Sequence, residues 1–194
     1  GASPEIDREM FHNLLGVDVV SKPNGREYHY DLTDEWMQAD QWKIYPCEVT
    51  PWTVIEKWYK EGKYKPYAEN GDILEELLMW TKSRVFPWIR LNRVIRDIPN
   101  QHILGGNANT NMRQQLQIEM KKRGMACRCI RCREVGLNSF SNKKSKGADL
   151  IVRKYNGNGG IEYFISFESD HEKLIYGFAR LRISDNAGKN VFPE

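Results

Sequence analysis

The spacing of apolar residues changes along this 194-residue chain, and the change limits the folds that the chain can adopt. In the C-terminal part, residues 148–184, apolar and polar residues alternate, most clearly over 161–168. A period of two is typical of β-strands with one buried face. A glycine-rich turn at 156–160 and a third strand over 174–183 complete the pattern. We therefore expect an antiparallel meander with one apolar face.

The N-terminal part, residues 4–99, alternates helix and strand signals instead. Three helices are expected, at residues 4–15, 51–61 and 72–85, the last capped by Asp72. Two strands are expected, at residues 42–45 and 88–96. Alternating helices and strands are typical of a parallel α/β sheet, but two strands are too few to close a sheet or a barrel. The predicted class is therefore α/β with α+β character, in which this part is the end of a larger α/β domain.

Residues 100–147 connect these two parts. Three apolar residues recur every four positions and predict a helix that ends at Gly124, with Asn109 or Thr110 as its cap. The stretch 138–147 is polar, basic and rich in serine, so it is expected to be a mobile loop.

Positive charge is concentrated in the connecting region. Residues 121–147 contain nine Lys and Arg residues and a single acid, Glu134, whereas the rest of the chain has 20 basic and 25 acidic residues. Such a concentration favours a polyanion as the partner, most simply a nucleic acid. A solvated loop that binds nothing is the alternative.

Three of the four cysteines, Cys127, Cys129 and Cys132, lie inside this basic region. The C-x-C-x-x-C spacing lets three thiolates turn toward one point, and the neighbouring arginines favour the thiolate form. Zinc is the expected metal, with Cys47 or His102 as candidate fourth ligand, and an iron–sulfur cluster is the second choice. Buried free thiols or an oxidised pair are the alternatives without a metal.

The sequence also excludes a membrane-spanning protein, because no stretch approaches the roughly 20 apolar residues that a spanning helix needs. The first three residues, Gly1-Ala2-Ser3, lack an initiator Met and the apolar run of a secretory signal, and are typical of the scar left by tag removal. A cytoplasmic protein with no membrane partner is therefore expected.

The six tryptophans lie beside apolar helix and strand faces, so they are expected in the core rather than as platforms for base stacking. They are Trp36, Trp42, Trp52, Trp58, Trp80 and Trp88.

Eight short segments resemble one known family in their order and spacing. They are Trp42–Pro46, Glu61–Tyr67, Arg93–Pro99, Asn111–Gln114, Lys122–Cys127, Ile130–Gly136, Asn158–Phe164 and Leu174–Arg182. Over about residues 42–194 the chain resembles the catalytic subunit of the Elongator complex, the tRNA wobble-uridine acetyltransferase family. The first forty residues match this family poorly.

The resemblance implies a two-domain enzyme with tRNA lying across both domains. Residues 4–99 would be the C-terminal part of a radical-SAM partial TIM barrel, residues 100–147 a linker with a structural zinc site at the cysteine cluster, and residues 148–194 the first antiparallel strands of a GNAT-type acetyltransferase domain. In that family acetyl-CoA, S-adenosylmethionine and a four-iron iron–sulfur cluster add a carboxymethyl-type group at C5 of the wobble uridine. Other Elongator subunits are implied partners.

Two motifs of that family are absent from this sequence, namely the cluster-binding C-x9-C-x2-C motif and the Gln-x-x-Gly-x-Gly loop that holds the pyrophosphate of acetyl-CoA. The chain is therefore expected to be an internal fragment, inactive alone and without catalytic residues, that contributes tRNA binding and the linker. A stand-alone zinc-dependent RNA-binding module and a protein or histone acetyltransferase are the alternatives. The basic linker suits RNA better than a cationic histone tail.

Nine basic residues are candidates for contacts with tRNA, namely Lys121, Lys122, Arg128, Arg131, Arg133, Lys143, Lys144, Arg93 and Arg96. The first five flank the cysteines and are expected to bind phosphates, because a metal-bound loop would hold them in register. Ion pairs with nearby acids are the alternative for the arginines. The two loop lysines, with Lys146, would clamp the tRNA or stay solvated.

Overall fold

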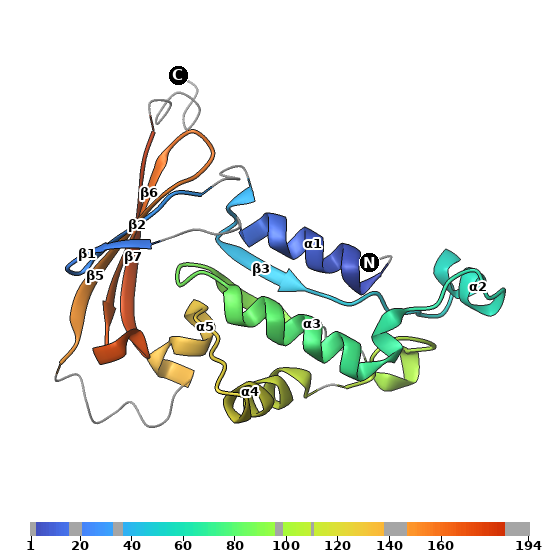
Figure 1. Cartoon of the computed structure of the whole chain (residues 1–194). Helices are drawn as coiled ribbons and strands as arrows, with labels where there is room; N and C mark the ends of the chain where they lie inside the picture. Colours follow the sequence, from blue (N-terminus) through green and yellow to red (C-terminus); the bar gives the residue numbers. More distant parts are fainter. Residues whose placement is uncertain are drawn as a thin grey trace, which may run out of the picture. The chain divides into compact units, whose positions relative to one another are not determined.

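The structure, a computed structural model, describes residues 3–15, 21–32, 37–95, 99–109, 111–137 and 147–184. The chain forms two compact units, and most of the helices and strands of both are labelled in Figure 1. Unit 1 comprises Gly1–Phe11, Gln41–Val85 and Ile89–Arg128. Unit 2 comprises His12–Asp40, Phe86–Trp88 and Cys129–Glu194. Each unit is therefore assembled from segments that are far apart in the sequence.

Two parallel strands form the sheet of unit 1. β3 (Gln41–Ile44) pairs with β4 (Arg90–Val94), so that Trp42 lies opposite Leu91. The parallel pairing confirms the expected α/β character. The second strand begins at Arg90 rather than at Trp88.

Helices supply most of the core of unit 1. They are α1 (Pro4–Leu15, in unit 1 up to Phe11), α2 (Val54–Lys60), α3 (Gly71–Arg84) and α4 (Met112–Lys122), with short 3-10 helices η2 (Tyr67–Glu69) and η3 (Asn100–His102). α3 packs against α4, and each buries residues that recur every three or four positions, as Leu74, Leu77 and Leu78 do. Phe11 of α1 stacks on Trp42 of β3, with 6.2 Å between ring centroids.

The caps of two helices differ from the expectation. Asn70, and not Asp72, caps α3, because its extended backbone lets its side-chain oxygen accept the N–H of Ile73. Asp72 lies in the first turn instead, where its negative charge meets the positive end of the helix dipole. Asn111 is the cap position of α4, and Asn109 accepts the N–H of Asn111 through its side chain (3.0 Å). Thr110 lies outside the described residues.

Unit 2 contains a five-stranded sheet with the order β1-β2-β5-β6-β7. Its strands are β1 (Ser21–Asn24), β2 (Glu27–Tyr30), β5 (Asp149–Asn156), β6 (Ile161–Glu168) and β7 (Ile175–Ile183). The antiparallel pairing of β5, β6 and β7 confirms the predicted meander. The unit also holds α5 (Ile130–Arg133), η4 (Val135–Leu137) and η6 (Asp170–Glu172).

The sequence did not predict the hairpin β1–β2. The first strand expected from the sequence was at residues 42–45, whereas two strands joined by a tight turn already lie between Ser21 and Tyr30. β2 joins the meander by parallel pairing with β5, so that Glu27 lies opposite Val152. A segment from the N-terminal part thus completes the sheet of the C-terminal part.

Aromatic rings form the centre of unit 2. Trp88 is fully buried and lies flat on Tyr155 of β5, with 4.2 Å between centroids and 10° between planes. Phe86 stacks on Trp88 at 4.5 Å, and Tyr30 of β2 meets Trp88 edge-on at 4.7 Å. These contacts explain why the short segment Phe86–Trp88 belongs to unit 2.

The expectation that all six tryptophans are core residues is wrong for two of them. Trp42 and Trp88 are buried and Trp80 is half-buried, whereas Trp52 is 94% exposed and Trp58 is 48% exposed. Trp58 lies in α2, which has seven residues and buries none of them, and Trp52 lies just before that helix. Trp36 lies outside the described residues. Among the residues described, no helix has the length and apolarity to cross a membrane.

Candidate functional site

The three clustered cysteines converge as their spacing predicted. The sulfur atoms of Cys127, Cys129 and Cys132 all lie within 4.8 Å of one another. Cys129 is the cap residue of α5, and the N–H of Cys132 donates to the carbonyl of Cys129 over 3.1 Å. One helical turn therefore brings these two thiols to the same side. A tetrahedral zinc site with zinc–sulfur bonds of about 2.3 Å places its sulfur atoms about 3.8 Å apart. Small rotations of the cysteine side chains would therefore bring the three sulfur atoms to zinc-binding distances.

The donor set fits a thiophilic metal, since three soft thiolates at one point suit zinc or an iron–sulfur cluster. Among the described residues the group consists of the three cysteines, and neither Cys47 nor His102 belongs to it. Cys47 lies instead against the Tyr64 hydroxyl. Burial, and next the hydrogen bond with the Cys47 thiol, raise the pKa of Tyr64.

Arg133 follows the last cysteine directly, and its guanidinium is buried in unit 2. It donates to the Glu168 carboxylate (2.7 Å) and to the backbone carbonyls of Pro87 (2.9 Å) and Glu172 (3.1 Å). Arg133 therefore does not present its charge to a phosphate, although it was a candidate for tRNA binding. Instead, it fastens α5 to β6 and to the segment before β7.

Glu168 also binds a second buried arginine. Arg153 of β5 reaches both oxygens of Glu168, at 2.7 and 3.1 Å, and the Glu172 carboxylate at 2.8 Å. Ser166 donates to Glu168 as well (2.6 Å). Burial is the largest single effect and would lower the pKa of Arg153, but the hydrogen bond with Glu168 and the negative charges of Glu168 and Glu172 together outweigh it, so the pKa is raised. We call Arg133, Arg153, Glu168 and Glu172 the buried ion network.

Two lysines of the predicted phosphate set lie together at the end of α4, and both are exposed. Lys122 pairs with Glu119 over 3.2 Å, at the C-terminal end of the helix. Lys121 is its neighbour on the last turn. Their positive charges also interact favourably with the negative end of the helix dipole. The two lysines therefore stabilise the helix as well as being available to a ligand.

The other candidates are more scattered. Arg128 is exposed between two of the cysteines, and Arg131 in α5 is half-buried. Arg93 of β4 is exposed and donates to the Tyr45 hydroxyl over 3.4 Å. Three candidates, Arg96, Lys143 and Lys144, lie outside the described residues, as does Lys146.

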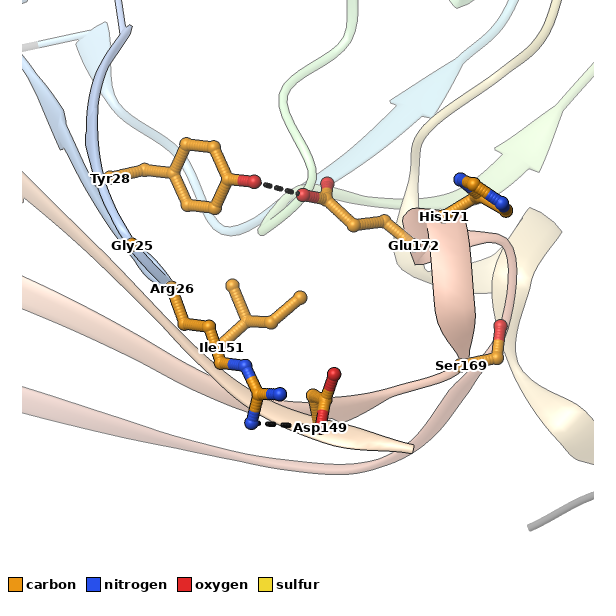
Figure 2. A pocket seen from close by; sticks show the side chains of 8 residues that line it. All are labelled: Gly25, Arg26, Tyr28, Asp149, Ile151, Ser169, His171 and Glu172. Atoms are coloured by element: carbon orange, nitrogen blue, oxygen red, sulfur yellow. Dashed lines mark hydrogen bonds and ion pairs between the residues drawn. The ribbon is translucent and has the colours of Figure 1, made fainter. Parts of the chain in front are cut away.

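Unit 2 also contains a pocket of about 200 Å³ beside the buried ion network. Its lining residues are Gly25, Arg26, Tyr28, Asp149, Ile151, Ser169, His171 and Glu172. Figure 2 shows an ion pair on one side, Arg26 with Asp149, and the Tyr28 hydroxyl pointing to Glu172 on the other. The hydrogen bond to Glu172 raises the pKa of Tyr28. Because both carboxylates already have partners, the pocket does not offer a free charge to a ligand.

Sequence reasoning missed both the network and the pocket. Their residues come from segments far apart in the sequence, such as Tyr28 of β2 and Glu172 of η6, which are 144 positions apart. The alternation in β6 pointed to the wrong face: Glu168 shares its face with the buried Phe164 and Ser166, whereas apolar residues of the other face, such as Ile161 and Phe167, are exposed. A buried charge of this kind needs a buried partner.

Known proteins align with nearly the whole chain. Residues 39–122 match the family described as the Radical_SAM C-terminal domain. The tRNA uridine(34) acetyltransferase of Methanocaldococcus infernus is 33% identical over 185 residues, which is 94% of this chain and 31% of the relative. Elongator complex protein 3 of Saccharomyces cerevisiae is 38% identical over 184 residues, 91% of this chain and 33% of the relative.

A solved structure agrees with these sequence relatives. The structure of Methanocaldococcus infernus Elp3 with an N-terminal deletion matches with a TM-score of 0.77 at 33% identity, covering 95% of this chain and 39% of that chain. The chain thus spans about a third of the length of the curated relatives it matches, 31% and 33% for the two named above. The family suggested by the sequence segments is confirmed, and the chain belongs to the family of the tRNA uridine(34) acetyltransferases and Elongator complex protein 3.

Proposed function

We propose that this chain is part of a tRNA-modifying acetyltransferase and contributes tRNA binding and the connection between two catalytic domains. The observation that carries the proposal is the 33% identity over 94% of the chain to a relative named tRNA uridine(34) acetyltransferase. The full-length protein would use acetyl-CoA, S-adenosylmethionine and a four-iron iron–sulfur cluster to add a carboxymethyl-type group at C5 of the wobble uridine. The Radical_SAM match at residues 39–122 supports the radical part of this chemistry.

The proposed division of the chain keeps residues 4–99 with the radical-SAM domain, 100–147 as the linker and 148–194 with the acetyltransferase domain. The pairing of β2 with β5 adds residues 21–30 to the acetyltransferase sheet. Other Elongator subunits are proposed partners and the cytoplasm the proposed location.

The cysteine cluster is proposed as a structural zinc site. A zinc ion held by Cys127, Cys129 and Cys132 would cross-link the segment before α5 to α5 itself. Such a cross-link would fix the backbone of Arg128 and Arg131 and leave Arg133 to anchor α5 in the buried ion network. Arg128, Arg131, Lys121 and Lys122 remain the proposed phosphate contacts, and Arg93 and the undescribed basic residues extend this set.

The first experiment measures zinc per chain by elemental analysis and tRNA affinity across a salt series. Three proteins are compared, namely the wild type, a double variant Cys127→Ser, Cys129→Ser, and Cys47→Ser as the matched control outside the cluster. We expect about one zinc per chain in the wild type and the control, as a structural site binds one ion. Affinity for tRNA should fall steeply with salt and weaken in the double variant only.

A chain without metal would contradict the structural site, and tRNA binding that ignores the cluster cysteines would contradict its role in binding. Iron and sulfide in place of zinc would identify the cluster as an iron–sulfur site. Equal affinity for tRNA and for duplex DNA would reduce the basic residues to a non-specific polyanion surface.

A further inference from the structure

Two exposed tryptophans and a valine lie on and just before α2. Trp52 is 94% exposed, Val54 66% and Trp58 48%, and α2 buries none of its residues. Val54 and Trp58 are four positions apart and therefore share one face of the helix. Lys57 lies next to Trp58 and is exposed. We call Trp52, Val54, Lys57 and Trp58 the α2 surface; α2 is labelled in Figure 1.

Hydrogen bonds hold Trp52 in place. The Thr53 side chain accepts the N–H of Glu56 (3.2 Å), and Glu56 reaches back to accept the N–H of Trp52 (2.7 Å). Thr53 also donates to the carbonyl of Thr50 (2.7 Å). This reciprocal arrangement fixes the start of α2. The indole is therefore carried by a defined turn and not by a frayed helix end.

The backbone of Trp52 makes its exposure more unusual. Its φ is +63°, in the left-handed region that a bulky side chain rarely adopts. A large apolar side chain on a strained, hydrogen-bonded turn, with almost all of its surface in water, does nothing for the stability of the fold. Strain of this kind is concentrated at binding sites, where the surrounding structure holds a residue ready for a ligand.

Around the α2 surface, the basic side chains are more exposed than the acidic ones. The side chains of Lys57, Lys60, Lys63 and Lys65 are 68–79% exposed. The carboxylates that pair with them, on Glu56, Glu61 and Glu69, are only 18–35% exposed. The lysine side chains are thus more exposed than the carboxylates with which they pair. A ligand approaching the tryptophans meets positive charge first.

We propose that the α2 surface binds single-stranded RNA, with the indoles of Trp52 and Trp58 stacking on bases and Lys57 contacting a phosphate. Exposed aromatic rings among lysines suit a ligand that has both stackable faces and negative charge, and single-stranded nucleic acid has both. The proposal rests on the proposed tRNA-modifying function and adds a contact made by residues outside the basic segment around the cysteines. Because four lysines lie beside three carboxylates here, stacking should contribute more than charge to the affinity for RNA.

The test uses the 194-residue chain and an oligouridylate of about twelve nucleotides, long enough for one single-strand site. Trp52→Ala and Trp58→Ala are compared with Phe178→Ala, which removes a ring that is also 48% exposed but lies on β7 in unit 2. Each tryptophan variant should weaken binding about 5- to 100-fold, as loss of one stacked base does. The Phe178 variant should bind as the wild type does, and Trp52→Phe should restore most of the affinity.

An abasic oligonucleotide of the same length separates stacking from charge. It keeps the phosphates, so the tryptophan variants should bind it as weakly as the wild type does. Equal binding of oligouridylate by all variants, or equal loss on both oligonucleotides, would overturn the proposal. The two proposals fail separately. If Lys121→Ala lowers tRNA affinity but the tryptophan variants do not, only the α2 surface is refuted; if the wild type binds no tRNA, the proposed function is refuted.

Discussion

The buried ion network makes a sharp prediction for Glu168→Gln. Glu168 is fully buried and accepts four hydrogen bonds, from Arg133, Ser166 and both nitrogens of the Arg153 fork. A glutamine has nearly the same shape but no charge, and one of its two terminal groups is a donor. The substitution therefore leaves two buried guanidinium groups with Glu172 as the carboxylate that remains in the network.

The expected loss of stability follows from burial. Removing one partner of a buried ion pair costs about 3 to 5 kcal/mol, because the remaining charge stays desolvated. The retained shape avoids a cavity cost, so we expect a value within this range rather than above it. A domain of this size is stable by only about 5 to 15 kcal/mol, so unit 2 should lose a large share of its stability.

The matched control is Glu162→Gln, on the same face of the same strand. Glu162 pairs with Arg182 over 2.6 Å, but both side chains are partly exposed. Such a pair contributes about 0 to 1 kcal/mol. Urea unfolding followed by circular dichroism gives the free energies, and hydrogen exchange of peptides from β5 and β6 assigns the loss to unit 2.

Equal and small losses in the two variants, below about 1 kcal/mol, would refute the reasoning, because the network would then behave as a surface pair does. Faster exchange confined to peptides of unit 1 would refute it as well. A second variant, Glu168→Asp, keeps the charge but shortens the reach, and it should fall between Glu168→Gln and the wild type.

Three further predictions follow from other elements. Burial raises the pKa of Tyr67, as does its hydrogen bond with Asp7. Because the unfolded chain then loses this proton at a lower pH than the folded chain, the free energy of unfolding should fall as pH rises above about 10. Tyr67→Phe should flatten that fall in urea titrations at alkaline pH. Asn70→Ala should cost about 1 kcal/mol in unfolding free energy through the lost cap of α3, and unchanged stability would refute that cap. Lys121→Ala and Lys122→Ala should each reduce the steepness of a plot of log tRNA affinity against log salt concentration by about 0.7 to 0.9. The urea midpoint of unfolding should not change. An unchanged slope would show that these lysines do not contact phosphates.

Local patterns in the sequence predicted the regular elements well. The alternation over β5 to β7 and the apolar face of α3 each extend over several turns or residue pairs, so the period is unambiguous. The hairpin β1–β2 was missed because its strands have four residues each and its partner, β5, lies far along the chain. Short polar strands carry no period that a local reading could detect.

The candidate site was predictable only where its residues are neighbours in the sequence. Three thiols within six residues need no tertiary information to converge, and they do. The role of Arg133 was not predictable, because its partner Glu168 is 35 positions away and a run of arginines looks solvated until its neighbours are known. The exposure of Trp52 and Trp58 was missed because apolar residues at helical spacing indicate a buried face only where another element covers it.

The parallel pairing of β2 with β5 has a consequence for how the protein is made. After β2 leaves the ribosome, about 120 residues must be added before β5 can pair with it, which takes on the order of 10 s at ordinary translation rates. During this interval Tyr30 lacks Tyr155, its partner in the strand pairing, and the nascent hairpin is too small to be stable alone. Closing so long a loop also costs about 4 kcal/mol of chain entropy. Unit 2 therefore completes its sheet only after unit 1 has been synthesised, and a fragment that begins at β5 would expose the aromatic ring that Trp88 covers.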